Sequence, residues 1–127
     1  MRTLGIITGF ALLTCGCTRT APTLAGGRPV EHWVLELKSP DAKARRHATE
    51  KLGNVGPNDP AVLPALRAAL DDGNAQVRAT AILALMKCGP AARDAVPALT
   101  AMQETDRSRE VRGYASKALA KLNGEMK

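Results

Sequence analysis

The sequence predicts an all-α fold, a short α-solenoid of three helical hairpins with about six helices. The segment that starts at Leu37 recurs 33 residues later at Leu70, and a third copy follows after a further shift of 34. Within each copy, apolar residues recur with the 3.6-residue period of one helix face. No stretch of useful length alternates with period two, as a half-buried strand does. Stacked helical pairs of this kind share one continuous core.

The first predicted hairpin begins at Val30. Its first helix carries Trp33 at helical spacing from other apolar residues, and we expect Trp33 to belong to the core. Asp41 is the expected N-cap of the second helix, and Gly56-Pro57 is its expected end.

The second and third hairpins follow the same plan. Asp59 and Pro60 are expected to start one helix, Asn74 to cap the next, and Gly89-Pro90 to end it. Asp106 is the expected cap of the last helix. The predicted core faces of the three second helices are Ala44, Ala48 and Leu52; Val77, Ala81, Ala84, Leu85 and Cys88; and Val111, Ala115, Ala118, Leu119 and Leu122.

Residues 1–16 predict an export signal. Arg2 precedes an apolar run, Leu4–Leu13, which is too short to span a bilayer as a helix but suits a secretory signal. Two cysteines, Cys15 and Cys17, follow at once. The arrangement resembles the signal of bacterial lipoproteins, which is cut before a cysteine that receives lipid.

Cys17 fits this resemblance best, because the small Gly16 precedes it, although Thr14 stands where the family usually has Leu. Processing at Cys15, ordinary secretory cleavage and an uncleaved anchor remain alternatives. The resemblance implies an exported, membrane-anchored lipoprotein of the cell envelope. We expect a lipidated cysteine and flexible linker over residues 17–29, the solenoid over 30–124 and a tail over 125–127.

Composition narrows the function classes. The net charge of +6 would suit an anionic partner or simply a soluble surface. Basic and acidic residues are mixed along the helices without a long Lys/Arg block, which disfavours nucleic acid. After processing at Cys17, the remaining thiol is Cys88, which we expect to be a small buried hydrophobe without a disulfide.

Nothing in the sequence indicates catalysis. Neither His32 nor His47 is followed by Glu, and His47 with Glu50 supplies too few ligands for a metal site. No nucleophile motif and no phosphate-binding glycine loop is present. We therefore expect no enzyme activity, no catalytic residue, no metal and no cofactor.

The helix start Asp/Asn-x-x-Val/Ala-Arg, the Ala-x-x-x-Leu core and the Gly-Pro exit together resemble HEAT repeats. More narrowly, they are similar to the bacterial HEAT-like repeats named after phycobilisome lyases. The resemblance covers about Val30 to Asn123 and implies a solenoid that binds a macromolecule through its concave face. It also implies that Arg45, Arg78 and Arg112 support neighbouring repeats, with aspartates such as Asp41, Asp72 and Asp106 as partners. An enzyme of the bilin lyase or metal hydroxylase type is the alternative.

Partner specificity is expected where the copies differ. Two rows of side chains on the second helices should face away from the core at matching positions: His47, Thr80 and Tyr114, then Glu50, Leu83 and Lys117. Leu83 and Met86 are apolar there, so they are either covered by a neighbouring turn or part of a contact patch. The sequence thus predicts a membrane-tethered module for protein–protein interaction. It does not identify the partner or the oligomeric state.

Overall fold

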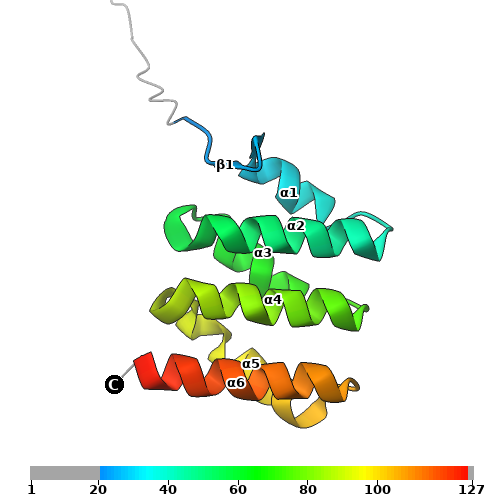
Figure 1. Cartoon of the computed structure of the whole chain (residues 1–127), viewed down its shortest axis with the longest axis vertical. Helices are drawn as coiled ribbons and strands as arrows, with labels where there is room; N and C mark the ends of the chain where they lie inside the picture. The colour runs from blue at the N-terminus through cyan, green and yellow to red at the C-terminus, as the bar shows by residue number, and fades with distance from the viewer. Residues whose placement is uncertain (1–20, 126–127) are drawn as a thin grey trace, which may run out of the picture.

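A computed structural model describes residues 21–125 of the chain (Figure 1). The predicted signal at residues 1–16, the lipidation at Cys17 and the tail residues 126–127 lie outside the described residues and stay predictions. Within the described range, the expected all-α solenoid is confirmed: three helical hairpins follow a short β-hairpin. Their elements are β1 Leu24–Ala25, β2 Arg28–Pro29, α1 Val30–Glu36, α2 Ala42–Val55, α3 Val62–Ala69, α4 Ala75–Cys88, α5 Val96–Thr105 and α6 Arg109–Glu125.

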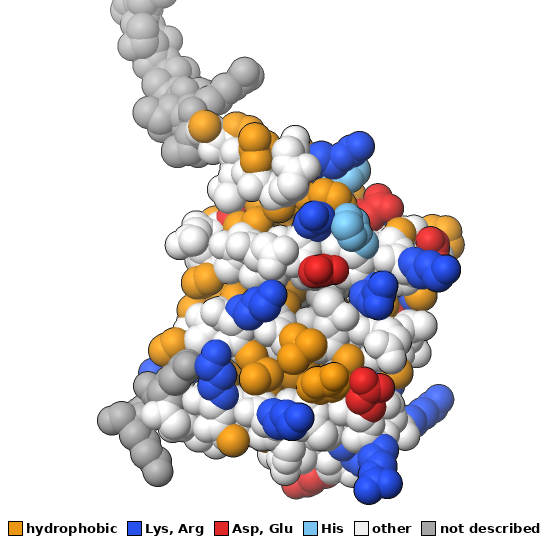
Figure 2. Space-filling model, viewed as in Figure 1, with side chains coloured by type: hydrophobic (Ala, Val, Ile, Leu, Met, Phe, Trp, Pro, Cys, Tyr) orange, Lys and Arg blue, Asp and Glu red, His pale blue; other side chains and the backbone are white. Residues whose placement is uncertain are grey.

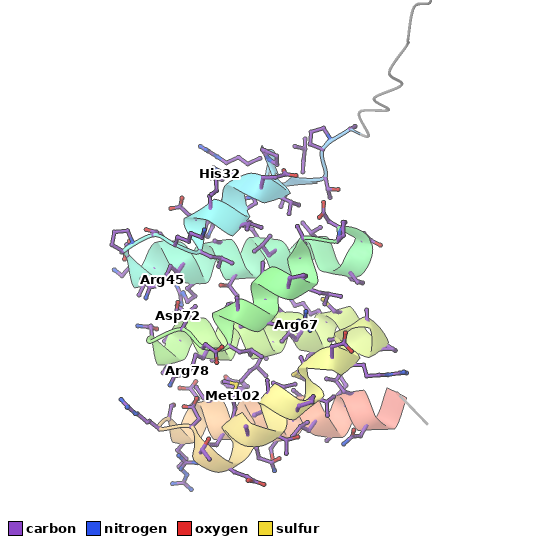
Figure 3. The ribbon with its side chains drawn as sticks, turned by 180° about the vertical axis from the view of Figure 1, so that it is seen from behind. His32, Arg45, Arg67, Asp72, Arg78 and Met102 are labelled. Atoms are coloured by element: carbon purple, nitrogen blue, oxygen red, sulfur yellow. The ribbon has the colours of Figure 1, made fainter. Side chains whose placement is uncertain are left out.

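The helices form two layers. The second helices of the hairpins, α2, α4 and α6, lie side by side in one layer, and α4 packs against both of the others (Figure 1). The first helices, α1, α3 and α5, cross behind them and are seen from the back in Figure 3. We call the outer surface of α2, α4 and α6 the front face.

Two predicted helix caps are confirmed. The Asp41 carboxylate accepts a hydrogen bond from the backbone N–H of Lys43 at 3.1 Å. The Asn74 side chain accepts from Gln76 at 2.9 Å and from Val77 at 3.3 Å. Each cap satisfies backbone donors that the first helical turn leaves open.

The predicted cap at Asp106 is wrong. Helix α6 begins at Arg109, and the Ser108 hydroxyl accepts from the backbone N–H of Val111 at 3.4 Å. Asp106 instead ends α5. The 34-residue shift accounts for the difference, because it pairs Ser108 with Asn74 and Asp106 with Asp72.

The remaining helix boundaries follow local chemistry. Helix α3 begins at Val62, two residues later than Pro60 suggested, and Asp59 caps the preceding turn by accepting from Ala61 N–H at 2.9 Å. Gly56 and Gly89 end α2 and α4 with φ of 69° and 61°, the left-handed region that glycine adopts without steric cost. The 3₁₀ turns Gly56–Asn58 and Gly89–Ala95 then lead into the next hairpins.

The core consists mainly of small and branched aliphatic side chains between the two layers. The predicted core faces are buried, except that Ala44 is only half-buried. Trp33 is 7% exposed, as expected of a core residue. Cys88 is buried and free, and burial raises the pKa of its thiol.

The predicted flexible linker is wrong for residues 24–29. These residues form an antiparallel β-hairpin in which Leu24 pairs with Pro29, although no strand was expected. Gly26 and Gly27 turn the chain with positive φ, as a two-residue hairpin loop requires. The hairpin also supplies the acceptor for the buried Trp33 indole, whose Nε1–H donates to the carbonyl of Ala25 at 2.9 Å.

Candidate functional site

An arginine joins the first repeat to the second. Arg45, in the first turn of α2, donates from Nε to Asp72 Oδ2 at 2.8 Å and from Nη2 to Asp72 Oδ1 at 3.1 Å. Its Nη1 donates to the carbonyls of Ser39 at 2.9 Å and Pro40 at 3.1 Å. One guanidinium thus holds the loop before its own helix and the equivalent loop of the next repeat.

The same arrangement joins the second repeat to the third. Arg78 donates from Nε and Nη2 to the two carboxylate oxygens of Asp106, both at 2.9 Å, and from Nη1 to the carbonyl of Asp72 at 2.9 Å. Figure 3 shows Arg45, Asp72 and Arg78 at this edge of the solenoid. The third arginine, Arg112, donates to the carbonyl of Asp106 at 2.6 Å. Among residues 21–125, no carboxylate forms an ion pair with Arg112 as Asp72 does with Arg45 and Asp106 with Arg78.

The ion pairs govern the protonation of their carboxylates. Burial disfavours the charged form of Asp72, but hydrogen bonds from Arg45 and from the backbone of Asn74 outweigh it, so the pKa of Asp72 lies below its ordinary value. Burial likewise opposes ionisation of Asp106, and bonds from Arg78 and Ser108 hold its pKa low. The hydrogen bond to Asp72 raises the pKa of Arg45. All three groups remain charged at neutral pH.

Lysines join the opposite ends of the same helices. Lys87, near the end of α4, donates from Nζ to Asn54 Oδ1 on α2 at 3.3 Å. Lys121, which the 34-residue shift pairs with Lys87, donates from α6 to the carbonyl of Met86 on α4 at 3.2 Å. The arginines thus reach forward to the following repeat and these lysines reach back to the preceding one. The front layer therefore has side-chain contacts between successive repeats at both of its ends.

A hollow of about 300 Å³ lies on the front face. Its apolar lining consists of Gly53, Leu83, Ala84 and Met86, and its polar lining of Glu50, Thr80, Lys87 and Lys121. Leu83 is 39% exposed, one of three large hydrophobic side chains exposed among the described residues, with Leu24 and Leu35. In Figure 2, apolar side chains gather on this face between Lys and Arg side chains.

The close approach of α2 and α4 at Gly53 shapes one wall of this hollow. A Cβ placed on Gly53 would lie 2.7 Å from Cβ of Ala84, too close for any side chain without movement. The equivalent position on α4 is Met86, whose half-buried side chain lines the hollow. Gly53 was not among the predicted site residues, since its role depends on a contact between helices that are distant in sequence.

The structure brings part of the predicted surface together. Glu50, Thr80 and Leu83 line the hollow. On α6, Lys117 places its Nζ 5.8 Å from the ring centroid of Tyr114.

His47 stands apart from this group. Its ring packs edge-on against the Trp33 ring of α1, with the two ring centroids 5.4 Å apart. Of the predicted row His47, Thr80 and Tyr114, only Thr80 lines the hollow, whereas Glu50 and Leu83 of the second row both do. Lys87 and Lys121 also line the hollow, although neither was among the predicted site residues. Their 34-residue spacing, which matches the repeat, is the sequence signal that could have identified them.

The described residues hold no group of three or more His, Cys, Asp or Glu side chains placed to bind a metal ion. Within the same range, no helix has the length and hydrophobicity needed to cross a membrane. What the front face offers is a preformed hollow with an apolar floor and a charged rim, suited to holding a side chain of another molecule.

Comparison with known proteins agrees with this architecture. A family model described as HEAT repeats matches residues 30–122, which cover all three hairpins. No curated protein matches the chain. HEAT repeats generally mediate protein–protein interaction. The match extends over most of the chain and coincides with the repeated hairpins, and the chain therefore belongs to the HEAT repeat family.

Proposed function

We propose that this chain is a non-catalytic protein-binding module that takes its partner on the front face, at the hollow around Leu83. The observation that carries the proposal is the exposed Leu83 in a hollow of about 300 Å³. A volume of this size suits the side chains of one short segment of a partner, which would complete the burial of Leu83 and Met86.

The contacts between successive repeats support this assignment. The Arg45–Asp72 and Arg78–Asp106 pairs hold one end of α2, α4 and α6, and the lysine contacts hold the other. A preformed surface loses less conformational entropy on binding than a surface that must order first. The family resemblance predicts that this face, which the second helices form, is the concave one.

We further propose that the module is exported and tethered to a membrane by lipid on Cys17. This part is supported by the sequence alone, through the short apolar run Leu4–Leu13 and the cysteine that follows the small Gly16. The residues between Cys17 and the β-hairpin would separate the binding face from the bilayer.

Site-specific photocrosslinking in the native cell tests the binding face. A photoreactive residue is placed at the half-buried Thr80 or the exposed Leu83 on the front, and at the exposed Ala68 on α3 as a control in the other layer. We expect one protein to crosslink from both front positions and not from Ala68. Equal capture from all three positions, or no capture from the front, would contradict the proposal.

A further inference from the structure

We infer that the segment bound in the hollow is acidic: it presents an apolar side chain to Leu83 and places carboxylates beside that side chain. This inference rests on the proposed function, because it names the chemistry of the partner at the same surface.

The charges around the hollow are unequal. Lys87 and Lys121 line it, and Lys117 lies one helical turn before Lys121 on α6. The single carboxylate in the lining is Glu50, on α2. All four side chains are exposed, so the α4 and α6 side of the rim is positive and the α2 side is negative. A segment with carboxylates over α4 and α6 is complementary to this pattern.

Lys87 can bind a carboxylate while it keeps its contact with Asn54. An ammonium carries three N–H donors, so the 3.3 Å bond from Lys87 to Asn54 does not exhaust its capacity. That bond also limits the positions that the Lys87 side chain adopts, which reduces the entropy lost when a second acceptor arrives.

A protein segment fits this surface better than an anionic bilayer does. The hollow lies between helices, so a flat layer of lipid headgroups would not fill it and would leave Leu83 and Met86 uncovered. Glu50 would also face the negative surface of such a bilayer, which costs free energy. A single peptide segment can turn a neutral or basic residue toward Glu50 and its acidic residues toward the lysines.

The test is a selection of random 16-residue peptides displayed on phage against the immobilised full chain at low salt. We expect enriched peptides to carry a Leu, Ile, Met or aromatic residue flanked by Asp or Glu. Enrichment of neutral or basic peptides, or no enrichment at all, would overturn the inference. Vesicles of phosphatidylglycerol and phosphatidylcholine form a second arm: binding to them that Leu83→Asp abolishes would assign the hollow to a membrane and also overturn it.

Charge variants then test the best peptide by fluorescence anisotropy. Lys87→Glu should weaken binding about tenfold, an effect that shrinks as salt is added. Arg67→Glu, an equal change of charge on α3 at the back (Figure 3), should leave the affinity within about twofold, as expected of an exposed charge away from the site. Glu50→Lys should tighten binding, a gain that misfolding cannot produce. Unchanged affinity in both Lys87→Glu and Glu50→Lys would overturn the inference.

These outcomes separate the two proposals. If selected peptides depend on Leu83 but carry no acidic residues, the binding face stands and the acidic partner is wrong. If selected peptides bind equally well to Leu83→Asp, the hollow itself is not the binding site and the proposed function fails as well.

Discussion

Arg78 on α4 and Asp106 after α5 form a bidentate ion pair, with Nε–Oδ2 and Nη2–Oδ1 distances of 2.9 Å each. The pair is well shielded: the arginine side chain is 14% exposed and the aspartate 7%. Arg45 and Asp72 repeat the arrangement one unit earlier. Packing between repeats therefore depends on the same charged contact at two successive junctions.

Replacing this arginine should destabilise the protein more than replacing its unpaired equivalent. Arg78→Met removes both bonds to Asp106 and leaves a shielded carboxylate, so we expect a loss of about 2–3 kcal/mol in the free energy of unfolding. Arg112→Met is the matched control, because among residues 21–125 the Arg112 guanidinium donates a hydrogen bond to the Asp106 carbonyl but forms no ion pair with a carboxylate. Urea unfolding measures both. Equal losses would show that the ion pair contributes nothing beyond the carbonyl contact.

The carboxylates predict the response to acid. Folding lowers the pKa values of Asp72 and Asp106. The two carboxylates therefore stabilise the folded state fully above the pKa of an aspartate in the unfolded chain, about 3.9, and this stabilisation is lost as the pH falls through their pKa values in the folded state. We expect stability to be steady near neutral pH and to fall below about pH 4. Unfolding of Asp72→Asn followed across this range should show a shallower fall; an unchanged slope would exclude Asp72 as its source.

Two glycines in helices should respond oppositely to alanine. At Gly53, the new Cβ would meet Ala84, so Gly53→Ala should force α2 and α4 apart and cost about 1–3 kcal/mol. At Gly113, nothing lies within 4 Å, so Gly113→Ala should stabilise α6 by about 0.5–1 kcal/mol. Thermal unfolding of both variants provides the measurement. A stabilising Gly53→Ala would mean that the helices are not in close contact there.

The β-hairpin should depend on one hydrogen bond. Trp33→Phe keeps an aromatic ring but removes the donor to Ala25, so residues 24–29 should open more often. Faster elastase cleavage after Ala25, in the first strand, would report this opening. Leu35→Ala, on the same helix but 66% exposed, is the control and should leave the cleavage rate unchanged. Equal rates in wild type and Trp33→Phe would refute the dependence.

Lipidation has a direct test. Cys17→Ala should release the protein from the membrane fraction of its native cell, whereas Cys15→Ala should leave it bound. Fractionation followed by immunoblotting measures the distribution. Release by Cys15→Ala instead would move the processed cysteine to Cys15, and retention of both variants would point to an uncleaved anchor.

The features predicted correctly from the sequence depend on local signals. The 33- and 34-residue shifts, the caps Asp41 and Asn74, and the glycines that end α2 and α4 are each encoded within a few neighbouring residues. The apolar faces follow from helical periodicity within single helices. These signals were sufficient to predict the solenoid.

The features that the sequence did not predict depend on contacts between distant residues. The β-hairpin persists because Trp33 needs an acceptor, a requirement that Gly26-Gly27 does not reveal by itself. The hollow depends on the approach of Gly53 to Ala84, which no single helix encodes. Asp106 is a different case, since the 34-residue shift already pairs it with Asp72 and the expected cap overlooked this.

The arginine and lysine contacts between repeats have a direction, which determines where a further repeat could be inserted into the array. The second repeat contacts the following unit through Arg78 and the preceding unit through Lys87, so a copy of this repeat brings both connections with it. The first repeat has Ser39 where the others have Asp72 and Asp106, and it could not accept an arginine from a unit placed before it in the same way. We therefore expect insertion of a copied unit between the second and third repeats to lengthen the array without loss of cooperativity. A unit added ahead of the first repeat would join as a separately melting segment.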